Sequence, residues 1–126
     1  MSKLDTLVVP QVDSLVVSIA PPNLLRLQGT ITMQEPSRVL GGFLRAVHEA
    51  VVADAVRVFE LDVTELKFVN SSAIRLFLDW AGWLKAMSPA TYRLKILTCR
   101  KFTWQKTSFV AITALAGGHI ELVAAS

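Results

Sequence analysis

A short polar stretch, FVNSSAIR at residues 68–75, places an asparagine and two serines where a strand-like apolar run meets a helical one. Asn70 is a favourable helix N-cap, because its side chain can accept a hydrogen bond from an amide of the first turn. Ser71 and Ser72 then fall in that turn, where unpaired amides and the helix dipole favour negative charge. Their hydroxyls can cap the helix, act as nucleophiles, or accept a phosphate that changes the local charge by about −2.

A catalytic role for these hydroxyls lacks the residues that it requires. No G-x-S-x-G elbow surrounds Ser71, and the sequence contains neither a G-x-x-x-x-G-K-S/T loop nor a G-x-G-x-x-G loop for a nucleotide phosphate. His48 and His119 are far apart, neither stands at metal-ligand spacing from Cys99, and His48 is expected on a helix surface. We therefore expect no enzyme, no catalytic residue, no cofactor and no metal.

Length and composition indicate one globular domain over residues 1–126. Hydrophobic residues make up 52% of the chain and charged residues 18%, which argues for a large core and against disorder. Arginines interrupt every apolar stretch before it reaches the roughly 20 residues of a membrane span. The N-terminus lacks a basic segment followed by a long apolar run, and one cysteine allows no internal disulfide. We expect a cytoplasmic domain without a membrane span.

Hydrophobic periodicity predicts an α/β domain with the element order β-β-α-β-α-β-α-β. The expected strands cover residues 12–20, 24–32, 56–63, 92–98 and 120–123, and the expected helices cover residues 35–51, 71–87 and 101–116. Such alternation implies a mixed, mostly parallel sheet packed with helices, joined by right-handed crossovers after an antiparallel hairpin. Residues 64–68, which include Lys67, are expected to form a loop before the two serines.

The stretch FELDVTELKFVNSSAIRLFLDW, residues 59–80, resembles the signature of STAS domains of the bacterial anti-sigma-factor antagonist type. That signature is close to L-D-L-S-x-V-x-F-[IM]-D-S-S-G-L. The matching positions are Leu61, Asp62, Val63, Thr64, Leu66, Phe68, Val69, Ser71, Ser72 and Ile74. The predicted element order resembles that of the STAS fold over nearly the whole chain. The sequence departs from the signature at Asn70, where the family has aspartate, and at Ala73, where it has glycine. GTIT at residues 29–32 also replaces the family's G-x-L-D.

The resemblance implies a non-enzymatic regulatory module of a bacterial partner-switching pathway, controlled by reversible serine phosphorylation. It implies Ser71 as the phospho-acceptor and Ser72 as a second candidate. The implied partners are a protein kinase or anti-sigma factor of the histidine-kinase ATPase type, which binds the unphosphorylated form, and a metal-dependent serine phosphatase. Lys67 and Arg75 flank the serines, and we expect either of them to pair with the phosphate.

The helix predicted from Ser71 carries two apolar stripes. Ile74, Phe77, Leu78, Ala81 and Leu84 form one, which is sufficient for packing on a sheet. Leu76, Trp80, Trp83 and Met87 form the other, displaced by about 120°. Because tryptophan dominates interface energetics and large exposed apolar patches are rare on monomers, this second stripe predicts a partner interface. The alternative is packing of the stripe against the first or third helix or against a bent terminus.

Two other functions remain open. A constitutive STAS-like scaffold, or a subunit associated with a lipid or anion transporter, would use the serines only as caps and would not be phosphorylated. A nucleic-acid-binding module would use the basic residues between Arg93 and Lys106. Such modules usually add aromatic platforms or a recognition helix to a basic patch, and only Tyr92, Phe102 and Trp104 are nearby. We therefore expect a protein partner rather than nucleic acid, with a homodimer as a further option.

Overall fold

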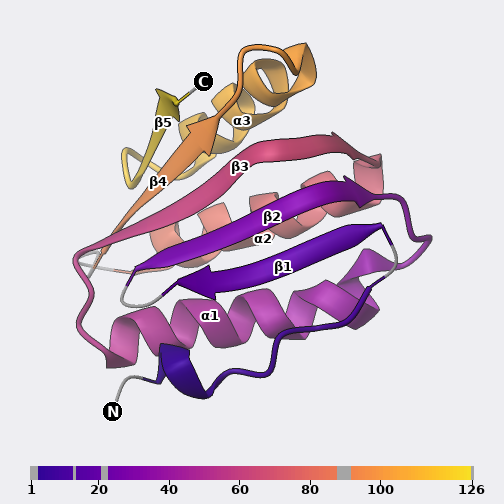
Figure 1. Ribbon diagram of the computed structural model, residues 1–126. Coiled ribbons are helices and arrows are strands. Elements are labelled where there is room, and N and C mark those ends of the chain that lie inside the picture. Colours follow the sequence, from indigo (N-terminus) through magenta and orange to yellow (C-terminus); the bar gives the residue numbers. More distant parts are fainter. Residues whose placement is uncertain (1–2, 13, 21–22, 88–91, 126) are drawn as a thin grey trace.

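A computed structural model of the protein describes residues 3–12, 14–20, 23–87 and 92–125 (Figure 1). Its strands are β1 (Leu15–Ala20), β2 (Leu24–Ile31), β3 (Val58–Val69), β4 (Arg93–Thr98) and β5 (Ile120–Ala124). Its helices are α1 (Gly42–Ala53), α2 (Ser71–Ala86) and α3 (Thr103–Leu115), with a 3-10 turn η1 (Leu4–Thr6) and a π-helical turn η2 (Ser37–Gly41). The predicted α/β class and the order β-β-α-β-α-β-α-β are confirmed.

The strands form one mixed sheet in the order β1-β2-β3-β4-β5. β1 and β2 are an antiparallel hairpin, and each later neighbour is parallel, as predicted. Each connection between parallel strands contains a helix and leads to the next strand on the same side, from β2 to β5. Because such crossovers are right-handed, α1, α2 and α3 all lie on one face of the sheet. The side chains on that face, such as Leu25, Phe59 and Leu94, are buried. The opposite face carries polar pairs such as Arg26 and Asp62, whose Nε and Oδ2 atoms are 3.0 Å apart.

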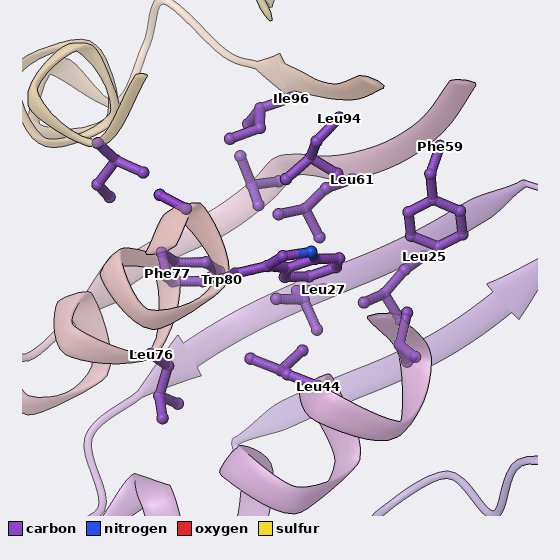
Figure 2. Packing of buried hydrophobic residues seen from close by; sticks show 14 of the residues in the cluster. Leu25, Leu27, Leu44, Phe59, Leu61, Leu76, Phe77, Trp80, Leu94 and Ile96 are labelled. Atoms are coloured by element: carbon purple, nitrogen blue, oxygen red, sulfur yellow. The ribbon is translucent and has the colours of Figure 1, made fainter. Parts of the chain in front are cut away.

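The second apolar stripe of α2 belongs to the core, so the partner interface predicted at Leu76 and Trp80 is wrong. Trp80 is 0% exposed and Leu76 is 3% exposed. Figure 2 shows the indole of Trp80 among side chains from β2, β3 and β4 and close to Leu44 of α1. Trp83 and Met87 are half-buried against the same core. A helix that packs on both the sheet and a neighbouring helix needs two apolar stripes, and α1 is that neighbour.

A polar cluster lies between α1, α2 and the start of β4. Trp80 Nε1 donates a hydrogen bond to Tyr92 Oη at 2.6 Å, and His48 Nδ1 lies 2.7 Å from the same oxygen. The imidazole of His48 also lies against Trp83, with ring centroids 5.5 Å apart. His48 is therefore buried rather than on the helix surface, because α2 and Tyr92 cover the side of α1 on which it lies.

β3 is longer than predicted and includes Lys67, which is on a strand and not in a loop. Its pairing with β2 shifts register between Arg26 and Gln28 and again between Gly29 and Thr30. The buried hydrophobic positions after Leu61 are consequently Val63, Leu66 and Val69, a spacing of two residues and then of three. The alternation that marks a strand in the sequence is broken at each register shift, although the strand itself continues.

The second half of β3 is held by side chains of α3 instead of by a strand on that side. β4 pairs with β3 only as far as Asp62. Beyond it, Gln105 Nε2 donates to the carbonyl oxygens of Val63 and Leu66 at 2.7 and 2.8 Å, and Gln105 Oε1 accepts from the amide of Cys99 at 2.8 Å. Trp104 Nε1 donates to the carbonyl oxygen of Lys67 at 2.8 Å. These bonds satisfy two buried carbonyl groups and one exposed carbonyl group on the part of β3 that β4 does not pair with, and they hold the strand end before Asn70 in place.

The remaining boundaries differ little from the prediction. β1 begins at Leu15 rather than at residue 12, and residue 13 lies outside the described residues. The first helix is preceded by η2, which begins after Pro36. None of the helices within the described ranges has the length and apolar content that crossing a bilayer requires.

Candidate functional site

Ser71 and Ser72 lie in the first turn of α2, directly after the end of β3, and both are exposed. In the part of the chain that the structure describes, neither hydroxyl takes part in a hydrogen bond. Their position results from local sequence: the strand ends at Val69, Asn70 has extended backbone angles, and helical residues follow. Both hydroxyls are therefore accessible to a protein that binds this end of α2.

Asn70 caps α2 as predicted and also makes a second, long-range bond. Its Oδ1 accepts from the amide of Ala73 at 2.9 Å, while its Nδ2 donates to the carbonyl oxygen of Met33 at 2.8 Å. Its own amide donates to the carbonyl oxygen of Ile31 at 3.0 Å. The amide side chain accepts at one end and donates at the other, whereas an ionised carboxylate has no donor and could not make the bond to Met33. That bond could not be predicted from the sequence, because Met33 is far from Asn70 along the chain.

The two serines line a groove with a volume of about 570 Å³ between the start of α2 and the segment that leads into η2. The described residues that line it are Gln34, Glu35, Pro36, Ser37, Ser71, Ser72, Arg75, Leu76, Leu78 and Asp79. The residues of the first wall, from Gln34 to Ser37, were not predicted as part of the site. They join it only because β2 ends beside β3 and directs the chain past the start of α2 (Figure 1).

Arg75 is the cation in this groove, and it has two carboxylates nearby. Its Nε lies 3.8 Å from Asp79 Oδ1, and both side chains are largely exposed, so this long ion pair contributes little to stability. Glu35, across the groove, pairs with Arg38 at 3.0 Å. Arg75 is thus able to turn toward a negative charge on a neighbouring serine.

Lys67 is not brought to the serines. It lines a separate hollow with Val16, Gln28 and Glu65. Of the predicted site residues, Ser71, Ser72, Arg75 and the buried Leu76 line the groove, and Asn70 lies beside it through its bond to Met33. Lys67 remains on β3, away from the groove.

The groove offers accessible hydroxyls at a helix N-terminus and, among its described lining residues, no histidine that could act as a base. This arrangement suits acceptance of a phosphate from another protein, because amides of the first turn and Arg75 both favour the added negative charge. Among the described residues, no group of three or more His, Cys, Asp or Glu side chains is arranged to hold a metal ion.

Neither a scan against protein-family models nor a search of the curated proteins finds a match to this chain. The structure establishes its class as a small α/β domain with a five-stranded mixed sheet, in which β1 and β2 are antiparallel and the other neighbours parallel.

Proposed function

We propose that this chain is a non-enzymatic interaction module, similar to STAS domains of the anti-sigma-factor antagonist type, whose binding to a protein partner is controlled by phosphorylation of Ser71. The observation that carries the proposal is the position of Ser71. It is an exposed hydroxyl in the first turn of α2, beside the cap residue Asn70 and at the edge of a groove. The STAS-like signature covers the same junction between β3 and α2, and the element order agrees with that resemblance.

The charges around Ser71 suggest how a phosphate would change partner binding. A phosphoserine adds a charge of about −2. Arg75, held only loosely by Asp79, can turn to the phosphate, while Glu35 and Asp79 add to the negative potential of the groove. A partner that presents acidic side chains to the groove would then be repelled. The proposed docking surface is this groove and its two walls, in place of the buried stripe that contains Trp80.

The resemblance supports a cytoplasmic kinase or anti-sigma factor of the histidine-kinase ATPase type as the partner, and a metal-dependent serine phosphatase as the protein that resets the switch. Ser72, also exposed, is the alternative acceptor.

A constitutive STAS-like scaffold or transporter-associated subunit is the second candidate function. It is favoured by the side chain of Asn70, whose oxygen and nitrogen are both engaged within the domain. The polar junction then has a structural role that needs no phosphate. In this case the partner would be permanent and Ser71 would remain unmodified.

Mass spectrometry of the protein from its native host distinguishes the two candidates. Trypsin cuts after Lys67 and Arg75 and releases residues 68–75 as one peptide that contains both serines. We expect a phosphate on Ser71, and we expect Ser71→Asp to weaken capture of the partner while Ser71→Ala retains it. Detection of the unmodified peptide alone across growth conditions, with equal capture by both variants, would instead support the scaffold.

A further inference from the structure

A second hollow, which shares no described lining residue with the groove at Ser71, lies at the C-terminal ends of β4 and β5 beside the first turns of α3. Figure 1 shows these three elements together at the edge of the sheet that β5 forms. The cavity has a volume of about 720 Å³, which is within the range of small-molecule sites. In open α/β sheets, ligands commonly bind outside the carboxyl ends of the strands.

One part of this cavity is cationic and rich in hydroxyl groups. Arg100, from the turn after β4, and Lys106, from α3, both line it, together with Thr103 and Thr107. Within the described ranges, neither cation forms an ion pair and none of the lining residues is acidic. Two cations that share a hollow without a counter-charge favour an anionic ligand, and the planar guanidinium of arginine is suited to a carboxylate.

The other part of the cavity is apolar. Phe102, Val110 and Leu122 line it, and the side chain of Val110 is 51% exposed although it is purely aliphatic. An apolar ligand body placed against these side chains would remove their surface from water, which is favourable. The two halves together require a ligand with both a charged end and a hydrophobic body.

We propose that this cavity binds a small amphipathic anion. Its carboxylate would lie between Arg100 and Lys106, and its apolar part would lie against Phe102, Val110 and Leu122. A nucleic acid fits this surface less well, because the nearby Trp104 is half-buried and its ring packs against Phe109, so it is not an open platform for stacking a base. The site does not depend on phosphorylation of Ser71.

The test is an NMR titration of the full chain with octanoate, followed through the methyl signals of Val110 and Leu122. We expect saturable binding by octanoate, and binding at least about tenfold weaker by acetate, which has only the charge, and by 1-octanol, which has only the apolar chain. Arg100→Gln and Lys106→Gln should each weaken octanoate binding by about fivefold to tenfold.

Lys101→Gln is the matched control, because Lys101 is an exposed neighbour that does not line the cavity and its loss changes the net charge equally. It should leave the octanoate affinity unchanged. Arg100 and Lys106 are exposed, so their variants should fold, and amide signal dispersion would verify this. The proposal is overturned by an absence of saturation, by equal shifts with acetate, or by an equal loss of affinity in Lys101→Gln.

Discussion

The side-chain nitrogen of Asn70 lies 2.8 Å from the carbonyl oxygen of Met33, and this hydrogen bond joins the start of α2 to the segment that leads into η2. The oxygen of the same side chain caps α2. One residue therefore holds together the two walls of the groove beside Ser71. An aspartate, the residue of the STAS-like signature, could make only the cap.

Replacing Asn70 by aspartate should consequently destabilise the domain. Asn70→Asp keeps a cap acceptor but directs a carboxylate oxygen at the oxygen of Met33, so we expect a loss of about 1–2 kcal/mol in the free energy of unfolding. Urea denaturation measures it. Ser72→Ala, an exposed change in the same turn, should stay within about 0.5 kcal/mol and serves as the control. An equally small change in Asn70→Asp would mean that the bond to Met33 contributes nothing.

A negative charge at Ser71 should be tolerated by the free domain. Ser71→Asp places a carboxylate at the positive end of α2, so we expect a gain of about 0.3–1 kcal/mol in stability at low salt, decreasing as salt is added. Ser71→Asn, the neutral variant of the same shape, should show no salt-dependent gain. If Ser71→Asp destabilises the domain relative to Ser71→Asn, repulsion by Glu35 and Asp79 exceeds the favourable contribution of the helix end.

Gln105 should be among the least replaceable polar residues, because its amide serves three main-chain groups while it is 0% exposed. Gln105→Glu keeps an acceptor for the amide of Cys99 but removes the donor to Val63 and Leu66, so a buried carboxylate oxygen would face two carbonyl oxygens. We expect a loss of about 3 kcal/mol or more in unfolding free energy. Gln34→Glu makes the same chemical change at an exposed position and should cost little. Similar denaturation midpoints for the two variants would contradict this role of Gln105.

Stability should fall on mild acidification because of His48. Burial, and then the nearby Arg45, lower the pKa of His48, and Glu49 opposes them only in part. Burial raises the pKa of Tyr92, which therefore stays protonated and can donate to Nδ1 of the neutral imidazole. Since the folded pKa lies below that of the unfolded chain, protons bind preferentially to the unfolded state. The contribution of neutral His48 to the free energy of unfolding is complete above about pH 6.5. It is lost as the pH falls from there toward the pKa of His48 in the folded state.

Denaturation between pH 7 and pH 5, two conditions on either side of the usual histidine pKa of about 6.5, measures this loss. His48→Gln should reduce the pH dependence of stability. Asp62 also contributes to stability, but its contribution changes with pH in a more acidic range. Burial tends to raise the pKa of Asp62, but hydrogen bonds from Thr64 and Arg26 lower it overall, so its contribution is lost only as the pH falls further. An unchanged slope in His48→Gln would assign the acid sensitivity to other groups.

The sequence by itself determined the element order, the sheet class and the local geometry at the serines. Apolar residues that recur every two residues in strands and every three to four residues in helices, together with short connections, were sufficient to predict a mixed, mostly parallel sheet. The cap at Asn70 and the first-turn position of Ser71 were predicted correctly, because capping depends on residues within one turn of each other. These properties are local, and local patterns encode them.

The tertiary structure alone decided the length of β3, the surroundings of Ser71 and the role of the second stripe on α2. Apolar periodicity shows which side of a helix avoids water, but it does not show what covers that side. Here the sheet and α1 together cover Trp80. In the same way, the register shifts of β3 and the bonds from Gln105 depend on β2 and α3. Asn70 meets Met33 only after two parallel strands have aligned their ends, so the second wall of the groove required the folded sheet.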